Sequence, residues 1–161
     1  MALRTQSGRS GQWRQVITVA PTITAGAYSL NDALGGLLTF ANASHGAGES
    51  GVVEALRLVD RAQQRPPLEL FLFDQTFTAM VDNAAWDPSD ADLDNCIGHI
   101  IIPADAYTDN LDNSVATVKG IELPYVTVGS YNIYGQLVIR GGPPTFIATS
   151  DMRVRLSVVK D

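Results

Sequence analysis

The segment most suggestive of phosphate chemistry is "NASHGAGESG", residues 42–51, which has glycines at positions 46, 48 and 51. Their i, i+2, i+5 spacing matches the dinucleotide-binding fingerprint, which functions between a parallel strand and a long helix. The sequence shows no repeated alternation of strands and helices, and the segment has no lysine or arginine to reach a phosphate. We therefore interpret residues 29–51 as the connection between two strands and predict that no nucleotide is bound.

Three aspartates at alternate positions, Asp90, Asp92 and Asp94, have the spacing of the first ligands in a calcium-binding loop. Such a loop would need glycine at its sixth position and glutamate at its twelfth, where this sequence has Asn95 and Ile101. Acidic residues are also favoured in the first turn of a helix, because they interact with the positive end of the helix dipole. The helical interpretation explains the same residues, so we predict that no metal is required.

General acid–base chemistry would fall to His45, in the glycine-rich segment, or to His99, in the apolar run "IGHIII". Neither histidine lies near a nucleophile-elbow pattern. The single cysteine, Cys96, leaves no partner for an internal disulfide, and we interpret it as a small core residue. We therefore expect that the protein is not an enzyme and that it needs no cofactor.

The apolar residues recur mostly with period two between turn-forming residues, which is the pattern of short antiparallel strands. A chain of 161 residues is long enough for one domain with a substantial core. The sequence thus predicts a mainly β fold, a single-domain antiparallel β-sandwich of jelly-roll-like type with seven or eight strands. The predicted strands are residues 13–19, 51–62, 68–76, 96–103, 114–128, 131–141 and 152–159.

Local signals refine this expectation. A short principal helix is predicted over Asp87–Asn95, with Asp87 as N-cap and Pro88 in the first turn. Residues 29–36 could form a further single turn that ends at Gly35. Pro124, inside a predicted strand, indicates an edge strand or a bulge at that position.

Charge is distributed unevenly along the chain. The formal net charge is −6, and the first twenty residues carry Arg4, Arg9 and Arg14 with no acidic residue. The 53 residues from Pro66 to Val118 contain no lysine or arginine, and their acidic residues are Glu69, Asp74, Asp82, Asp87, Asp90, Asp92, Asp94, Asp105, Asp109 and Asp112. Three arginines are too few for a strong nucleic-acid footprint, and no apolar run is long enough to span a bilayer, so we expect neither partner.

Residues 1–14 are predicted to be a flexible basic N-terminal arm, and residues 15–161 the β-sandwich domain. Two interpretations of the arm remain open. It is either a solvated tail or a segment that binds an acidic neighbouring subunit, where the ring of Trp13 would add buried apolar area. The candidate partner-binding residues are Arg4, Arg9, Trp13 and Arg14.

Three segments carry a family resemblance: "TITAGAYSLNDALGGLLTF", "LELFLFDQTFTAMVDNAAWDPSDADLDNCIGHI" and "YNIYGQLVIRGGPPTFIATSDMRVRLSVVKD". Together they resemble small structural virion proteins of tailed bacteriophages, over almost the whole chain from Val16 to Asp161. The resemblance implies a capsid decoration or cement protein that is synthesised in the host cytoplasm and located on the capsid surface. Its partners would be the major capsid protein and copies of itself, commonly as a homotrimer, and no catalytic residue is implied.

Two other functions stay open at this point. One is a structural component of the tail. The other is a carbohydrate-binding or adhesion-type sandwich module of the virion, which would need an exposed aromatic platform. Trp86, Tyr131 and Tyr134 are the candidates for such a platform.

Overall fold

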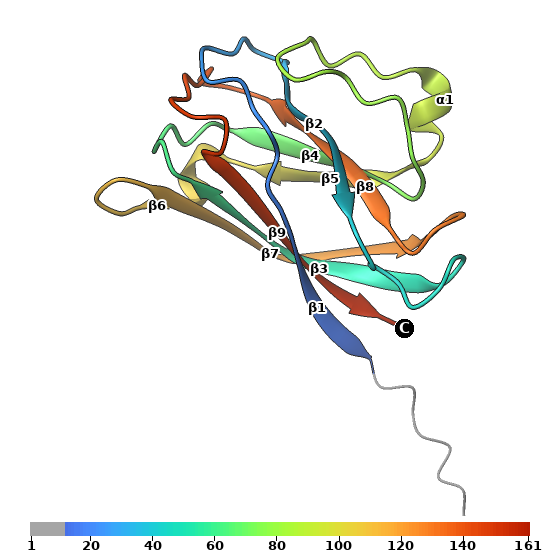
Figure 1. Ribbon diagram of the computed structural model, residues 1–161. Coiled ribbons are helices and arrows are strands. Elements are labelled where there is room, and N and C mark those ends of the chain that lie inside the picture. The colour runs from blue at the N-terminus through green and yellow to red at the C-terminus, as the bar shows by residue number, and fades with distance from the viewer. Residues whose placement is uncertain (1–11) are drawn as a thin grey trace, which may run out of the picture.

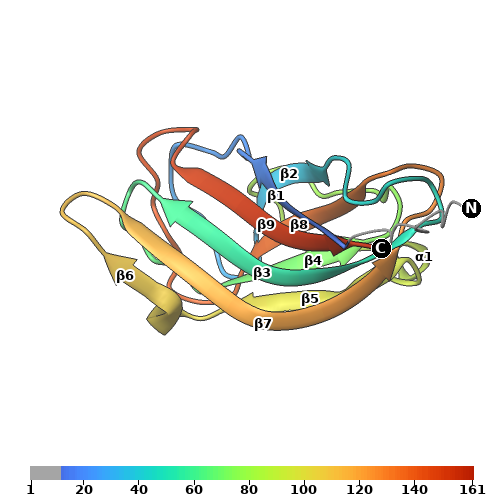
Figure 2. The same cartoon turned by 90° about the horizontal axis from the view of Figure 1, so that it is seen from below.

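The computed structural model describes residues 12–161, which fold into two antiparallel sheets packed face to face (Figure 1). One sheet has the strand order β1-β9-β3-β7-β6 and the other β2-β8-β4-β5, and Figure 2 shows β1, β9, β3 and β7 side by side. The predicted antiparallel sandwich is confirmed. The elements are β1 (Trp13–Val19), β2 (Ala33–Phe40), β3 (Ser50–Asp60), β4 (Leu68–Phe73), α1 (Asp90–Leu93), β5 (Cys96–Ile102), the 3-10 turn η1 (Ala104–Ala106), β6 (Tyr107–Asp109), β7 (Ser114–Val126), β8 (Ile133–Ile139) and β9 (Met152–Lys160).

The strands pair in a nested way, which is the topology of a jelly roll. β4 pairs with β5, β3 with β7, β2 with β8 and β1 with β9, so the chain resembles one long hairpin rolled into two sheets. Among the described strands, only the three-residue β6 lies outside this nesting, at the edge beside β7. Jelly rolls of two such sheets occur in viral capsid and lectin domains.

The core lies between the inner faces of the two sheets. Met152, Val154, Leu156 and Val158 of β9 are buried, as their alternation predicts, and they face the buried leucines of β4 such as Leu70. Burial of a side chain of this size contributes about 1.5–3 kcal/mol relative to an exposed one. The core therefore holds the two sheets together through their inner faces.

Residues 33–40 correct the prediction for the glycine-rich segment. They form strand β2, where we predicted a connection with a helical turn that ends at Gly35. Gly35 has a φ of 72°, it lies at a register shift between Leu34 and Leu38, and a Cβ there would lie 2.7 Å from the Cβ of Pro21. Pairing with the apolar β8 buries Leu34 and Leu38, and this outweighs the weak strand preference of the glycines.

The helix exists but is shorter than predicted. It spans Asp90–Leu93, and its N-cap is Ser89, not Asp87. The Ser89 hydroxyl accepts a hydrogen bond from the backbone N–H of Asp92 at 3.1 Å and donates one to the Asp92 carboxylate at 2.7 Å. A serine hydroxyl can both accept from the N–H and donate to the carboxylate, whereas the ionised Asp87 could only accept, so the helix begins two residues later than the proline signal indicated.

Pro124 lies on an open edge, as predicted. It is opposite Val52 of β3, and the other side of β7 pairs with β6 only through residues 114–116. A proline has no N–H to donate, so it is tolerated where no strand lies beside it.

A long segment, residues 74–95, covers the outer face of the four-stranded sheet, and we call it the cover (Figure 1). The buried side chain of Gln136 in β8 donates to the carbonyl oxygens of Gly35 and Met80 and accepts from the Met80 N–H. The Asp82 carboxylate accepts hydrogen bonds from the Tyr28 hydroxyl and the Gly35 N–H. Every residue of β8 is buried as a result.

Candidate interaction surface

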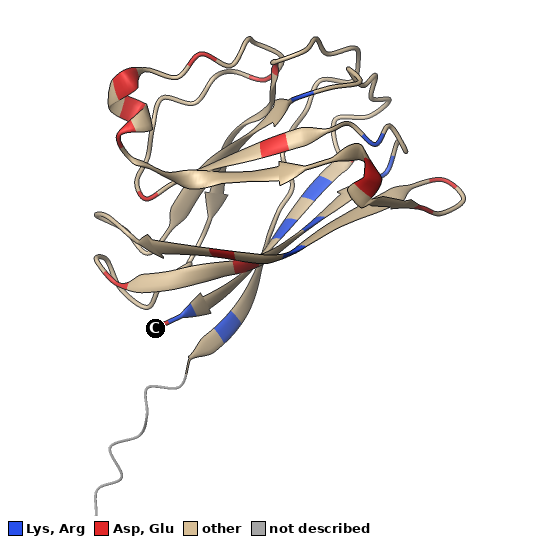
Figure 3. Cartoon of the chain, turned by 180° about the vertical axis from the view of Figure 1, so that it is seen from behind, with Lys and Arg blue, Asp and Glu red and all other residues tan. Residues whose placement is uncertain are grey.

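The outer face of the five-stranded sheet is exposed and basic, and we call it the basic face. It carries Arg14 on β1, Arg57 on β3, Lys119 on β7, and Arg153 and Arg155 on β9. Successive side chains of a strand point to opposite faces, so these residues point outward because their neighbours fill the core. Figure 3 shows several basic segments on this sheet, which also carries the acidic Glu54 of β3 and Glu122 of β7, whereas α1, in the cover on the other layer, is acidic.

Four of the five cations of the basic face have no ion-pair partner among residues 12–161. Arg57 and Arg155 are direct cross-strand partners, a like-charge arrangement that destabilises a sheet. Within residues 12–161, the side chains of Arg57, Arg155 and Lys119 form no ion pair, and the one such pair on this face joins Arg14 to Glu54 at 3.4 Å. The basic face therefore has unused capacity for an anionic partner.

A hollow of about 360 Å³ lies in the middle of the basic face, and we call it the Ala55 hollow. Its apolar lining consists of the side chains of Val16 and Ala55, and Leu56, whose side chain is buried in the core, contributes only backbone. Its polar lining comes from three strands, β3, β7 and β9, and comprises Arg57, Thr117, Lys119, Arg155 and Ser157. The hollow thus combines cations, hydroxyl groups and an apolar lining at one place.

The hollow lies where two adjacent strands are irregular. The pairing of β3 shifts between Val53 and Ala55 relative to both β7 and β9, so Glu54 is a bulged residue. On β7, the same shift is accommodated by Gly120 and Glu122, whose φ angles are 67° and 50°. Bulges bend a sheet and redirect side chains, and a non-glycine residue at positive φ stores strain. The chain therefore departs from regular pairing at the hollow.

A second group of polar and aromatic side chains lies at the β4–β5 edge of the other sheet. Glu69 pairs with both His99 and Arg140, at 2.5 Å in each case. The ring of Phe71 stacks on His99 with a centroid distance of 5.7 Å and lies 5.0 Å from that of Trp86. The charges here are satisfied among themselves, and the aromatic rings are partly covered by one another.

A second hollow, of about 460 Å³, opens at one end of the sandwich between Asp74, Tyr125 and Asp161. Burial raises the pKa of the Asp74 carboxyl, and Asp74 Oδ1 has no hydrogen-bond partner among the described residues. Burial, followed by the neighbouring Asp161, also raises the pKa of Tyr125. Asp161 accepts a hydrogen bond from the Ser50 hydroxyl at 2.6 Å, so only Asp74 is left without a partner.

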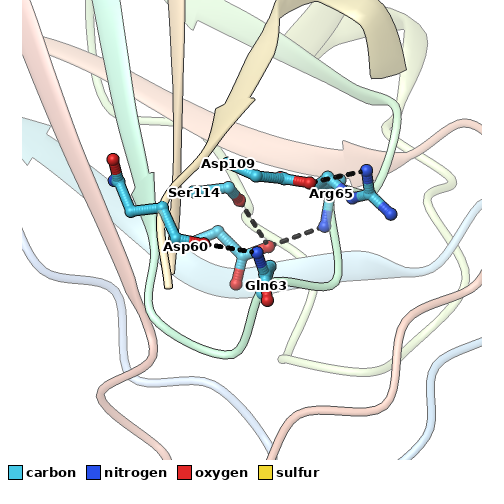
Figure 4. A network of polar contacts seen from close by, with 6 residues as sticks. Asp60, Gln63, Arg65, Asp109 and Ser114 are labelled. Carbon is cyan, nitrogen blue, oxygen red and sulfur yellow. Dashed lines mark hydrogen bonds and ion pairs between the residues drawn. The ribbon is translucent and has the colours of Figure 1, made fainter. Parts of the chain in front are cut away.

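The fully buried Asp60 has a structural role (Figure 4). Its carboxylate accepts hydrogen bonds from the backbone N–H groups of Ala62 and Arg65, at 3.0 and 2.7 Å, and from the Ser114 hydroxyl at 3.5 Å. Arg65 in turn pairs with Asp109 at 3.0 Å. This network fixes the turn after β3 to the β6–β7 hairpin and leaves no group of Asp60 free for chemistry.

The predicted partner-binding residues divide into two groups. Arg4 and Arg9 lie outside the described residues. Trp13 and Arg14 lie in β1, whose predicted bounds are confirmed, and the Trp13 ring is 65% exposed and meets His45 edge-on at 6.4 Å. Arg14 thus joins the basic face.

Sequence reasoning did not identify the cations in the middle of the basic face. Arg153 and Arg155 occupy the outward positions of the most regular predicted strand, which was the available signal. Arg57 and Lys119 come from other parts of the chain, and only the strand order brings them beside β9. Their grouping depends on the order and register of β7, β3 and β9, which the sequence pattern does not predict.

The residues considered for other chemistry are scattered. Asp90, Asp92 and Asp94 belong to or adjoin α1, and across the described chain no three His, Cys, Asp or Glu side chains are grouped to hold a metal ion. Burial raises the pKa of the Cys96 thiol, which disfavours the reactive thiolate. Tyr134 is 7% exposed and therefore offers no open aromatic face.

No helix within residues 12–161 is long and apolar enough to cross a membrane. Comparisons with protein-family models, with curated proteins and with solved structures found no match.

Proposed function

We propose that the protein is a structural protein of a bacteriophage virion, a capsid decoration protein that binds the major capsid protein through its basic face. The observation that carries this proposal is the exposed sheet face with five cations, of which only Arg14 has an acidic partner among the described residues. A surface of this kind is complementary to an acidic protein surface, and charge complementarity gives orientation and a faster association rate. The family resemblance and the jelly-roll topology support the virion context.

The proposal includes the arm and self-association. Arg4 and Arg9 precede β1 in the sequence and would extend the basic surface toward the same partner. Exposed ion pairs contribute only about 0–1 kcal/mol each, so attachment depends on many such contacts repeated over a lattice. The sandwich body, not the arm, would supply the contacts of a homotrimer. Sedimentation of the isolated protein measures whether it is a trimer.

The test is decoration of purified capsids at increasing salt. The double variant Arg14→Gln/Arg153→Gln removes two charges from the basic face outside the Ala55 hollow, and its binding should be weaker than that of the wild type. The control Arg61→Gln/Arg65→Gln removes the same charge from the turn after β3; it also removes the exposed Arg65–Asp109 ion pair, which contributes only about 0–1 kcal/mol, and it should bind normally. Equal binding by both variants across the salt range would contradict the proposed surface.

Deletion of residues 1–11 gives an independent test. It removes Arg4 and Arg9 and leaves β1 complete, so the protein should fold and keep its oligomeric state. Binding to capsids should weaken, and it should weaken further at high salt because exposed charge pairs are screened. Separate mass spectrometry of purified heads and tails distinguishes a capsid protein from a tail component.

A carbohydrate-binding module is the second candidate, favoured by one observation. Trp86 and Phe71 form a half-buried aromatic pair beside Glu69, His99 and Arg140, and lectin domains include jelly rolls. Sugar rings bind to such surfaces through aromatic contact and nearby polar groups. Quenching of Trp86 fluorescence by a host-surface polysaccharide, absent in Trp86→Phe, would favour this function over decoration.

A further inference from the structure

We propose that the Ala55 hollow is a binding site for small organic oxyanions, meaning molecules that carry a phosphate, sulfate or carboxylate group on a compact carbon skeleton. This inference is independent of the virion role and rests on the geometry of four strands. Two features converge there: polar groups that suit an anion, and a cavity that has space for the rest of the molecule.

The register places the polar groups in two adjacent cross-strand rows. In the first row Ala55 lies between Lys119 and Ser157, and in the second Arg57 lies between Thr117 and Arg155. Arginine presents several N–H donors in a planar fork that matches an oxyanion, and lysine and the hydroxyls add further donors. The small side chain of Ala55 leaves space at the centre, so a bound oxyanion could be reached from both rows.

Two features indicate that this arrangement serves a ligand and not the fold. Arg57 and Arg155 repel one another across the β3–β9 pair, and within residues 12–161 neither has an ion-pair partner. The chain also keeps two bulges here, with Glu122 at a φ of 50°. Both features cost stability, and a bound anion would offset the first of them.

The size and apolar lining of the hollow define the ligand class. Its volume of about 360 Å³ exceeds what a bare inorganic ion fills and falls at the lower end of small-molecule sites, which are about 300–1,000 Å³. The side chains of Val16 and Ala55 give the hollow its apolar lining. The protein as a whole carries a net charge of −6 and repels anions at long range, so binding must come from these direct contacts.

The probe is phenyl phosphate, compared with inorganic phosphate and benzyl alcohol in a low-salt buffer free of other oxyanions. Binding is measured by calorimetry and by backbone amide shifts at Ala55, Lys119 and Ser157. Phenyl phosphate should bind several-fold more tightly than inorganic phosphate, because the ring contacts the apolar lining, and benzyl alcohol should not bind. Equal affinity for the two phosphates, or no binding of either at millimolar concentration, would overturn the proposal.

Matched arginine variants on one strand separate the hollow from general surface charge. Arg155→Gln should weaken phenyl phosphate binding by about tenfold or more, because a charge-assisted hydrogen bond is lost. Arg153→Gln removes the same charge two residues away on the same face, outside the hollow, and should change the affinity less than twofold. Equal losses in the two variants would show that only surface charge matters.

A space-filling variant tests the cavity without any change of charge. Ala55→Leu occupies the centre of the two rows and should abolish binding, and Ser157→Leu fills the same hollow from β9 if the first variant does not fold. Unchanged affinity in a folded filling variant overturns the site. The capsid assay uses substitutions outside the hollow, so failure of one proposal is distinguishable from failure of the other.

Discussion

The two sheets of the sandwich expose their outer faces in opposite ways. On the four-stranded sheet the chain supplies its own cover, and polar groups of the sheet and of the cover, such as Gln136 and Asp82, are satisfied by hydrogen bonds with one another's segments. On the five-stranded sheet the outer face is exposed, and Arg57 and Arg155 lie opposite one another. A face whose charged and polar groups are paired gains little from a partner, whereas a face with repelling charges is less stable alone than with a partner. The basic face is therefore where interaction is expected.

The largest expected effect comes from the covered face. Gln136→Met should lower the free energy of unfolding by about 3 kcal/mol or more, because it leaves three backbone groups of Gly35 and Met80 without partners, at about 1–3 kcal/mol each. Urea unfolding measures the loss, and amide exchange at Met80 should accelerate. The control Gln75→Met, at a half-buried position whose side chain makes no hydrogen bond to another described residue, should change stability little.

The next effect is a loss of stability at alkaline pH. Burial raises the pKa of Tyr28, Tyr107 and Tyr125 above the ordinary value of about 10, and nearby Asp82, Asp60 and Asp161, respectively, raise them further. The folded state then holds protons that the unfolded chain releases, so this contribution is complete below pH 10 and decreases as the pH rises above it.

Each of these tyrosines can lower stability by up to about 1.4 kcal/mol per pH unit, so roughly 2–4 kcal/mol should be lost between pH 10 and 11. Urea unfolding at pH 9, 10 and 11 measures this slope. Tyr107→Phe should make the slope shallower, and Tyr131→Phe, at an exposed ring, should not. Parallel slopes in all three proteins would contradict the assignment to buried tyrosines.

A smaller effect is expected for the carboxylate that anchors the cover. Asp82→Asn should cost about 1–3 kcal/mol, because the amide can accept from only part of the set formed by Thr24, Tyr28 and the Gly35 N–H. Asp87→Asn is the matched control, since Asp87 is exposed, and it should change stability by less than about 0.5 kcal/mol. Similar effects of both would mean that net charge, not the anchor, sets stability.

The smallest effect has the opposite sign and belongs to the basic face. Arg155→Gln should raise the free energy of unfolding by about 0.2–1 kcal/mol at low salt, because Arg57 loses a like-charged neighbour. The gain should vanish at high salt, where the repulsion is screened. Arg153→Gln, whose cross-strand partner is Val59, should leave stability unchanged, and a destabilised Arg155→Gln would remove the contrast between the two faces.

The sequence predicted those parts of the fold that depend on local pattern. β9 follows from clean alternation and β1 from a less regular one, and the edge position of Pro124 follows from its lack of an N–H. β2 was missed because its glycines weaken the strand pattern, and only pairing with β8 reveals it. The helix start was misplaced because the Ser89 cap competes with the signal of Asp87 and Pro88, and side-chain geometry decides between them.

The candidate site was less predictable than the fold. Arg14 was found as one of a run of basic residues near the start of the chain, and the structure places it on the basic face. Arg57, Lys119 and Arg155 are far apart in the sequence, and each is an ordinary outward residue on its own strand. They form a group only through the strand order and through the shift at Ala55. Neither the strand order nor this register shift can be predicted from the hydrophobic pattern of a single strand.

The nested pairing of the strands also sets the order in which this chain can fold. β1 pairs only with β9 among the described strands, and Trp13 lies opposite Lys160. On a ribosome, β1 therefore emerges before the other described strands and stays without its partner until β9, the last of them, has been synthesised. Folds dominated by such distant contacts form slowly, in milliseconds to seconds, and an unpaired strand is exposed to association with other chains during that time. The polar residues Arg14, Gln15 and Thr18 in β1 make such association less favourable while the strand is unpaired.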